Sequence, residues 1–251
     1  MTKTFQKTGR TWKSCKALLF DKDGTLINFR LLWLGWCREV IRALSPSYDP
    51  VTVEKCLAVW GVDLALGSIE PGGCLAIGSR LELQQSLAAE LHDQGFCADE
   101  ANAQVLLAMH QAYRAVEEKK LVQPIEGIFS TISDLHRRGY ALAVVTTDDT
   151  AKANDNLKTL GLQTYFAVVI GCDKVASCKP APDLVLEACR ILKIKPDQAA
   201  VIGDTTADMI MGIAAGTACN IGVASGVTAP QTLAEHADLV LESAAEMARS
   251  D

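Results

Sequence analysis

Positive charge, aromatic side chains and paired cysteine motifs are all scarce in this sequence. Among its 251 residues, 24 lysines and arginines stand against 30 acidic residues, so the formal net charge is -6. That balance provides no broad attraction to a polyanionic backbone, which argues against nucleic-acid binding. The nine cysteines are odd in number and form no Cys-x-x-Cys motif. This usage favours reduced, packing thiols and a cytoplasmic location over a disulfide framework.

A long uninterrupted apolar run is also missing. Residues 209–227 carry no charge, but four glycines, Thr217, Asn220 and Ser225 interrupt them. A buried helix followed by a buried strand explains this composition better than a membrane span does, so we expect no membrane association. The segment through Lys13 is basic but precedes no apolar signal core, and we expect it to be a loose tail.

Five short apolar runs predict fully buried parallel strands. They cover residues 17–20, 141–145, 167–170, 199–202 and 220–223. Between the later four lie segments with helical spacing, at residues 151–160, 182–192 and 207–215. Alternation of strand and helix predicts an α/β fold with a doubly wound parallel sheet.

The segment between the first two predicted strands is far longer than a crossover needs, and it contains no convincing strand. Its spacing predicts helices over residues 31–43, 52–66, 80–93 and 99–118. We therefore predict two domains. Residues 14–27 and 124–251 form the α/β core, and residues 28–123 form an all-helical domain inserted after the first strand.

Polar side chains follow four of the predicted strands. In chain order these groups are Asp21-Lys22-Asp23-Gly24-Thr25, Thr146-Thr147-Asp148-Asp149, Lys179-Pro180 and Gly203-Asp204-Thr205-Thr206-Ala207-Asp208. Because ligands bind beyond the carboxyl ends of strands in open α/β sheets, we expect these groups to share one rim. An Asp-rich turn or an exposed loop lysine would explain any single group. The ordered set favours a catalytic site.

This set resembles the haloacid dehalogenase superfamily, specifically its phosphatases with a helical cap after the first motif, such as phosphoglycolate phosphatase. The family pattern is Asp-x-Asp-Gly-Thr, a Ser or Thr ending the second strand, a Lys, and Gly-Asp-x-x-x-Asp. The matching residues are Asp21, Asp23, Gly24, Thr25, Thr146, Lys179, Gly203, Asp204 and Asp208. The resemblance spans residues 16–241 and implies the core strand order 3-2-1-4-5.

The resemblance implies a role for each catalytic residue. Asp21 is the expected nucleophile, which forms an aspartyl phosphate, and Asp23 is the expected general acid and base. Thr146 and Lys179 are expected to act on the transferring phosphoryl group, and Thr147 to help bind it. We therefore expect hydrolysis of a small phosphate monoester.

Carboxylates gathered this closely raise each other's pKa values, so the site calls for a divalent cation. Mg²⁺ is expected because it prefers oxygen ligands and bridges to phosphate. The resemblance implies as ligands Asp21, the Asp23 backbone carbonyl and Asp204, with Asp208 acting through water. Arg30 lies just past the first motif and is either a contact for an anionic substrate or a solvated hinge charge.

Several readings stay open. A phosphomutase of the β-phosphoglucomutase type would use the same residues, and a catalytically silent binding protein would share the fold.

Lys22 echoes the Asp-Lys-Thr-Gly-Thr motif of P-type ATPases, but we interpret it as occupying a variable position. Asp148 and Asp149 are expected to lie at the start of the following helix, where the helix dipole is positive. The insert is long enough to act as a lid that limits substrate size. Oligomeric state is not predicted.

Overall fold

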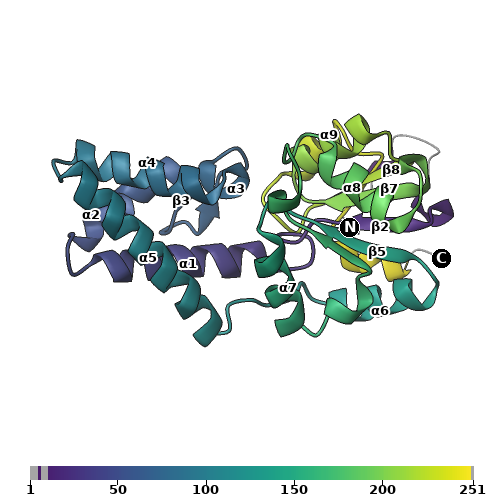
Figure 1. Cartoon of the computed structure of the whole chain (residues 1–251), viewed down its shortest axis with the longest axis horizontal. Helices are drawn as coiled ribbons and strands as arrows, with labels where there is room; N and C mark the ends of the chain where they lie inside the picture. The colour runs from purple at the N-terminus through teal and green to yellow at the C-terminus, as the bar shows by residue number, and fades with distance from the viewer. Residues whose placement is uncertain (1–4, 7–10, 250–251) are drawn as a thin grey trace. The chain divides into compact units, whose positions relative to one another are not determined.

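The computed structural model describes residues 5–6 and 11–249. The chain divides into two compact units, one of Met1–Asn28 with Pro124–Asp251 and the other of Phe29–Gln123 (Figure 1). Among the described residues, every helix is too short or too polar to cross a lipid bilayer.

The first unit is built on a seven-stranded sheet. Its order is β1-β9-β8-β7-β2-β5-β6, with β1 antiparallel to β9 and every other neighbouring pair parallel. The strands are β1 Phe5–Gln6, β2 Ala17–Phe20, β5 Ala141–Val145, β6 Val168–Ile170, β7 Ala199–Gly203, β8 Cys219–Val223 and β9 Leu239–Leu241. All five predicted strands are present, and β6-β5-β2-β7-β8 is the 3-2-1-4-5 order that the resemblance implied.

Helices cover both faces of this sheet, which explains why its central strands are apolar throughout. They are α6 Ile128–Arg137, α7 Thr150–Thr159, α8 Asp183–Leu192, α9 Thr206–Ala215 and α10 Pro230–Leu233. On one face, Leu184 of α8 and Met209 of α9 join Leu19 and Val201 in the core. Figure 1 shows α6 and α7 on the opposite side of the sheet. The fold is therefore the doubly wound α/β sheet that the sequence predicts.

The N-terminal segment differs from the loose tail that the sequence predicts. Phe5–Gln6 pairs with β9, with Phe5 opposite Val240. Trp12 is buried, and the Tyr140 hydroxyl donates a hydrogen bond to the Lys13 carbonyl oxygen at 3.0 Å. The prediction is wrong for these residues because their order comes from partners distant in the sequence, namely β9 and Tyr140. The rest of the segment lies outside the described residues.

The second unit is helical apart from one short hairpin. Its helices are α1 Phe29–Leu44, α2 Pro50–Cys56, α3 Cys74–Ile77, α4 Arg80–Asp93 and α5 Ala98–Glu118. Antiparallel strands β3 Val62–Asp63 and β4 Ser68–Ile69 form the hairpin. After α2 the chain continues as a 3-10 turn over Leu57–Trp60, and the predicted helix over residues 52–66 is wrong from Gly61 on, because Gly61 adopts a left-handed conformation with φ 75°. The Asp63 carboxylate then accepts from the Leu66 N–H at 2.8 Å and fixes the turn.

Aromatic residues form the centre of this second unit. Trp36 is almost fully buried and stacks on Trp60 with ring centroids 5.3 Å apart. Tyr113 of α5 packs on the same indole at 5.3 Å. The Trp60 indole N–H donates to the Leu83 carbonyl oxygen at 2.9 Å, so burial leaves that polar group satisfied.

Candidate active site

The carboxyl end of β2 places Asp21 beside a buried lysine. The Asp21 N–H donates to the Ile202 carbonyl oxygen of β7 at 2.8 Å, which continues the strand pairing into the loop. Lys179 Nζ contacts the Asp21 carboxylate and lies 2.7 Å from Asp208 Oδ1. Burial raises the pKa of Asp21 to about 7, against the opposing effect of Lys179. Burial alone would lower the pKa of Lys179, but Asp208 and Asp21 together raise it.

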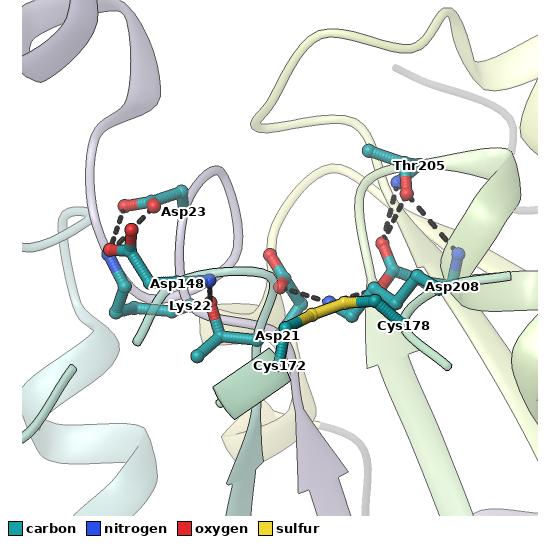
Figure 2. Close-up of polar contacts among 10 residues, drawn as sticks. Asp21, Lys22, Asp23, Asp148, Cys172, Cys178, Thr205 and Asp208 are labelled. Atoms are coloured by element: carbon teal, nitrogen blue, oxygen red, sulfur yellow. Dashed lines mark hydrogen bonds and ion pairs between the residues drawn. A yellow bond between two sulfur atoms is a disulfide. The ribbon is translucent and has the colours of Figure 1, made fainter. Parts of the chain in front are cut away.

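The first turn of α9 holds Asp208 in a fixed orientation. Thr205 caps this helix, and its hydroxyl donates to Asp208 Oδ2 at 2.6 Å while accepting from the Asp208 N–H at 3.2 Å. This reciprocal cap leaves Asp208 Oδ1 for Lys179. Figure 2 shows Thr205 and Asp208 on one side of Asp21.

Asp204 completes a cluster of three buried carboxylates. One ligand oxygen from each of Asp21, Asp204 and Asp208 lies within 4.8 Å of the other two. Asp204 Oδ2 accepts from the Val227 N–H at 3.1 Å, but its buried Oδ1 accepts no hydrogen bond from any residue that the structure describes. Burial, and then the charges of Asp21 and Asp208, raise the pKa of Asp204 well above its ordinary value.

This cluster can hold a metal ion. Its donors are carboxylate oxygens, which hard divalent cations prefer, and the free oxygen of Asp204 is buried without a partner of its own in the described chain. Space around Asp204 depends on glycine. A Cβ at Gly24 would lie 2.4 Å from Asp204 Oδ2, and one at Gly226 would lie 1.8 Å from it. The residues present therefore fit a divalent cation.

A second buried lysine forms a neighbouring group with two other carboxylates. Lys22 is fully buried, and its Nζ donates to both oxygens of Asp23 at 2.7 Å. The same nitrogen lies 3.0 Å from Asp148 Oδ2 (Figure 2). Burial would lower the pKa of Lys22, but Asp148 and Asp23 more than offset it and raise the pKa. Burial raises the pKa of Asp23, against the charge of Lys22.

This arrangement gives Lys22 and Asp148 partners that the sequence does not predict. The interpretation of Lys22 as a variable position stays a prediction, and the structure adds that its ammonium group has two acidic partners. Of the two acids expected to open α7, Asp149 is the N-cap residue, although its side chain makes no capping hydrogen bond, and Asp148 pairs with Lys22. No sequence pattern indicates that Lys22 pairs with Asp23 and Asp148, because a lysine between two motif acids cannot be distinguished from any other loop lysine.

The remaining predicted residues lie in different surroundings. Thr146 is buried directly after β5, and its Oγ1 accepts from the Asp148 N–H at 3.2 Å. Thr147 is exposed on the same loop. Arg30 is exposed in α1 and belongs to the second unit. The structure thus brings Asp21, Lys179, Asp204 and Asp208 into one cluster and places Asp23 in the group around Lys22.

The loop that carries Lys179 contains a disulfide. Cys172 and Cys178 are joined, with their Cα atoms 5.4 Å apart, and Lys179 follows directly (Figure 2). The expectation of reduced thiols is wrong for this pair. It fails because a helical turn at Cys172–Lys174 begins the loop and the chain then folds back, so cysteines six residues apart meet without a Cys-x-x-Cys motif. Outside this pair, five cysteines are buried, as expected of packing residues: Cys15, Cys37, Cys56, Cys189 and Cys219.

The loop after β8 also contributes to this rim, and sequence reasoning missed it. The Ser225 hydroxyl donates to the Gly24 carbonyl oxygen at 2.6 Å, and the Val227 N–H holds Asp204. The only available signal was its position after the last predicted strand. The loop ties the turn that follows β2 to the acid that follows β7.

Comparison with known proteins agrees with this geometry. The family model described as haloacid dehalogenase-like hydrolase matches residues 15–216, which include both acid motifs and Lys179. Pyrophosphatase PpaX of Halalkalibacterium halodurans is 32% identical over 199 residues, which are 79% of this chain and 79% of that protein. The chain therefore belongs to the haloacid dehalogenase-like hydrolase family and is a phosphatase-like hydrolase.

Solved structures show the same fold. A predicted phosphoglycolate phosphatase from Haemophilus somnus aligns with a TM-score of 0.69 at 20% identity, over 96% of this chain and 99% of that one. A β-phosphoglucomutase from Clostridium difficile aligns with a TM-score of 0.65 at 18% identity, over 93% of each chain. At these identities the likeness concerns the fold alone.

Proposed function

We propose that the chain hydrolyses a small phosphate monoester in a Mg²⁺-dependent reaction, through a phosphoryl group carried by Asp21. The observation that carries this proposal is the surroundings of that carboxylate. Asp21 follows the central strand β2, contacts Lys179, and shares an oxygen-lined cluster with Asp204 and Asp208. A carboxylate held beside a cation and at a metal-type site is equipped for nucleophilic attack on phosphorus.

The chain's own residues account for both halves of the reaction. An oxygen of Asp21 forms a bond to phosphorus as the ester bond breaks, and Asp23 gives a proton to the departing alkoxide. Asp23 then removes a proton from water, which attacks the phosphorus of the aspartyl phosphate. Inorganic phosphate leaves and the Asp21 carboxylate is restored. Lys179 and the Thr146 hydroxyl stabilise the phosphoryl oxygens during both transfers.

In the proposed metal site, Asp21, the Asp23 backbone carbonyl and Asp204 would hold Mg²⁺, and Asp208 would act through water. When bound, the ion supplies neutralising charge for the carboxylates and for the phosphoryl oxygens. Asp208 also holds Lys179 in place at 2.7 Å. Asp204 is itself oriented by the Val227 N–H.

Inorganic pyrophosphate is a second candidate substrate. The relatives named pyrophosphatase PpaX match 79% or 80% of this chain. The same residues would serve, since a phosphoric anhydride also offers a phosphorus to Asp21. Its leaving group is phosphate, a much weaker base than an alkoxide, so this substrate depends less on proton donation by Asp23.

The test measures phosphate release from phosphoglycolate, sugar phosphates, pyrophosphate, a phosphopeptide and a terminally phosphorylated oligonucleotide. We expect turnover of small substrates that stops in excess chelator and returns with Mg²⁺. Full activity in chelator would exclude the metal, and a tenfold preference for either large substrate would exclude the small-substrate class. An isomerised sugar phosphate without phosphate release would identify a phosphomutase. No turnover even of an aryl phosphate would favour a silent binding protein.

A further inference from the structure

We propose that Lys22 is a positioning residue that fixes the Asp23 carboxylate for proton transfer by anchoring it to Asp148 on the neighbouring strand's loop. The inference rests on the proposed function, because it assigns Lys22 a task within that reaction. It concerns the residue between the two motif acids.

The contacts of Lys22 leave its ammonium group no unused donor. A lysine has three N–H groups, and Nζ lies 2.7 Å from both oxygens of Asp23 and 3.0 Å from Asp148 Oδ2. Its side chain is 0% exposed, whereas that of Asp23 is 15% exposed. A buried charge is costly unless it is paired, so the position of this ammonium is dictated by its two carboxylates. Asp23 keeps a face toward solvent, and Lys22 does not.

The backbone around Lys22 is equally constrained. Its carbonyl oxygen accepts from the Leu26 N–H at 2.9 Å and from the Ile27 N–H at 3.0 Å. Gly24, with φ 87°, turns the chain between these residues. Lys22 is therefore fixed at both its backbone and its ammonium group, so it can hold the Asp23 side chain in one orientation.

Asp148 links Lys22 to the loop that follows β5. β2 and β5 are parallel neighbours, with Phe20 opposite Val144, so the loops that follow them leave the sheet side by side. The Asp148 N–H in turn donates to Thr146 Oγ1 at 3.2 Å. Lys22 thus connects Asp23 to the loop that holds the expected phosphate-binding threonine. Without Lys22, Asp23 and Asp148 would face each other as like charges, and Asp23 would lose both bonds that orient it.

A merely structural role for Lys22 predicts a different outcome from a positioning role. If Lys22 only supports the fold, its loss slows every substrate alike. If it orients Asp23, the loss is large for substrates whose leaving group needs a proton and small for those whose leaving group does not. General acid catalysis typically contributes about a hundredfold to ten-thousandfold, which sets the upper limit of the effect.

The experiment compares Lys22→Met with the wild type on two kinds of monoester. One is the alkyl phosphate that the wild type hydrolyses best, and the other is 2,4-dinitrophenyl phosphate, whose leaving group departs without protonation. We expect kcat/KM to fall by about thirtyfold or more for the alkyl ester and by less than about threefold for the dinitrophenyl ester. Most of the loss should lie in kcat, because Lys22 is buried and does not meet substrate.

Matched variants separate this effect from general damage. Lys158→Met makes the same change at an exposed position of α7 and should leave both substrates unaffected. Lys22→Arg keeps the charge and offers five N–H donors in a different geometry, so it should recover part of the alkyl-ester activity. Asp148→Asn removes the anchor charge and should reproduce the pattern of Lys22→Met at smaller size, about threefold to tenfold on the alkyl ester alone.

Should Lys22→Met fail to fold, Asp148→Asn and the Lys22→Met/Asp148→Asn double variant, which removes one charge of each sign, carry the test. Equal losses on both substrates, or no loss on either, would overturn the positioning role. A wild type that turns over neither monoester would instead defeat the proposed function before any variant is made. The two failures are therefore distinguishable.

Discussion

The two buried lysines at the sheet rim have similar contacts, but the clusters around them contain different numbers of carboxylates. Lys179 and Lys22 each bind two carboxylates with a buried ammonium group. The Lys179 cluster consists of Lys179, Asp21, Asp204 and Asp208, and the Lys22 cluster consists of Lys22, Asp23 and Asp148. With every group ionised, the first carries three negative charges against one positive, a net of -2, and the second carries two against one, a net of -1.

This difference in charge indicates different tasks. In the Lys179 cluster, Asp204 Oδ1 lacks a hydrogen-bond partner within the described chain, and a net charge of -2 is what a divalent cation neutralises. In the Lys22 cluster the ammonium already contacts both acids, and the excess charge rests on a partly exposed pair. The first cluster can therefore accept a divalent cation, whereas the ammonium group of the second already contacts both of its acids.

The largest expected contrast comes from Asp21→Asn. An amide is no nucleophile toward phosphorus, so we expect turnover to fall by about a thousandfold or more for every substrate, alkyl or aryl. The Asp148→Asn change in the Lys22 cluster should spare the aryl ester. Both variants are measured by kcat/KM, with circular dichroism to verify the fold. Retention of a tenth of wild-type turnover by Asp21→Asn would refute the assignment of the nucleophile.

A smaller effect is expected from Gly226→Ala, which disturbs one cluster only. Its Cβ would meet Asp204 Oδ2 at 1.8 Å, so the carboxylate must move, and we expect Mg²⁺ affinity to fall by about tenfold. Isothermal titration calorimetry measures that affinity directly.

The matched control for this variant is Gly139→Ala. Gly139 has φ 90° and open space around its Cβ position, so this change strains the backbone away from the site. It should lower the melting temperature and leave Mg²⁺ affinity unchanged. Equal loss of affinity in both variants would mean that general destabilisation, and not Asp204, explains the result.

The smallest expected effect is the response of metal-free stability to pH. The pKa of Asp21 is raised to about 7 in the folded chain, so the folded state keeps its proton to a higher pH than the unfolded state does. The resulting stability is present at acidic pH and is lost as pH rises toward and through 7. The raised pKa of Asp204 acts in the same direction.

Melting temperatures in chelator at pH 5.5 and pH 8, each repeated with Mg²⁺, measure this response. We expect Mg²⁺ to raise the melting temperature more at pH 8, where it binds carboxylates that no longer hold a proton. Asp21→Asn should reduce the dependence on pH in chelator. A larger stabilisation by Mg²⁺ at pH 5.5 would contradict the proposed link between the ion and these acids.

The sequence was sufficient for the central sheet because its signals are local. Strands β2 and β5 begin and end where the apolar runs do, and a parallel sheet requires that the residues after such strands share one rim. The contact between Lys179 and Asp21, which are 158 residues apart, follows from that requirement together with the ordered motifs. Helix α4 likewise begins and ends where the predicted helix over residues 80–93 does.

Other features depended on partners that no local pattern specifies. The β1–β9 pairing joins residues from the two ends of the chain, and the Cys172–Cys178 bond depends on how one loop folds back. The hydrogen bond from the Val227 N–H to Asp204 likewise depends on how the loop after β8 folds. For Lys22, the sequence determined its place between two motif acids. Only the tertiary structure decided that the loop after β5 brings Asp148 Oδ2 to 3.0 Å from Lys22 Nζ. Such pairing matters because a lysine charge is buried at low cost only where carboxylates pair with it.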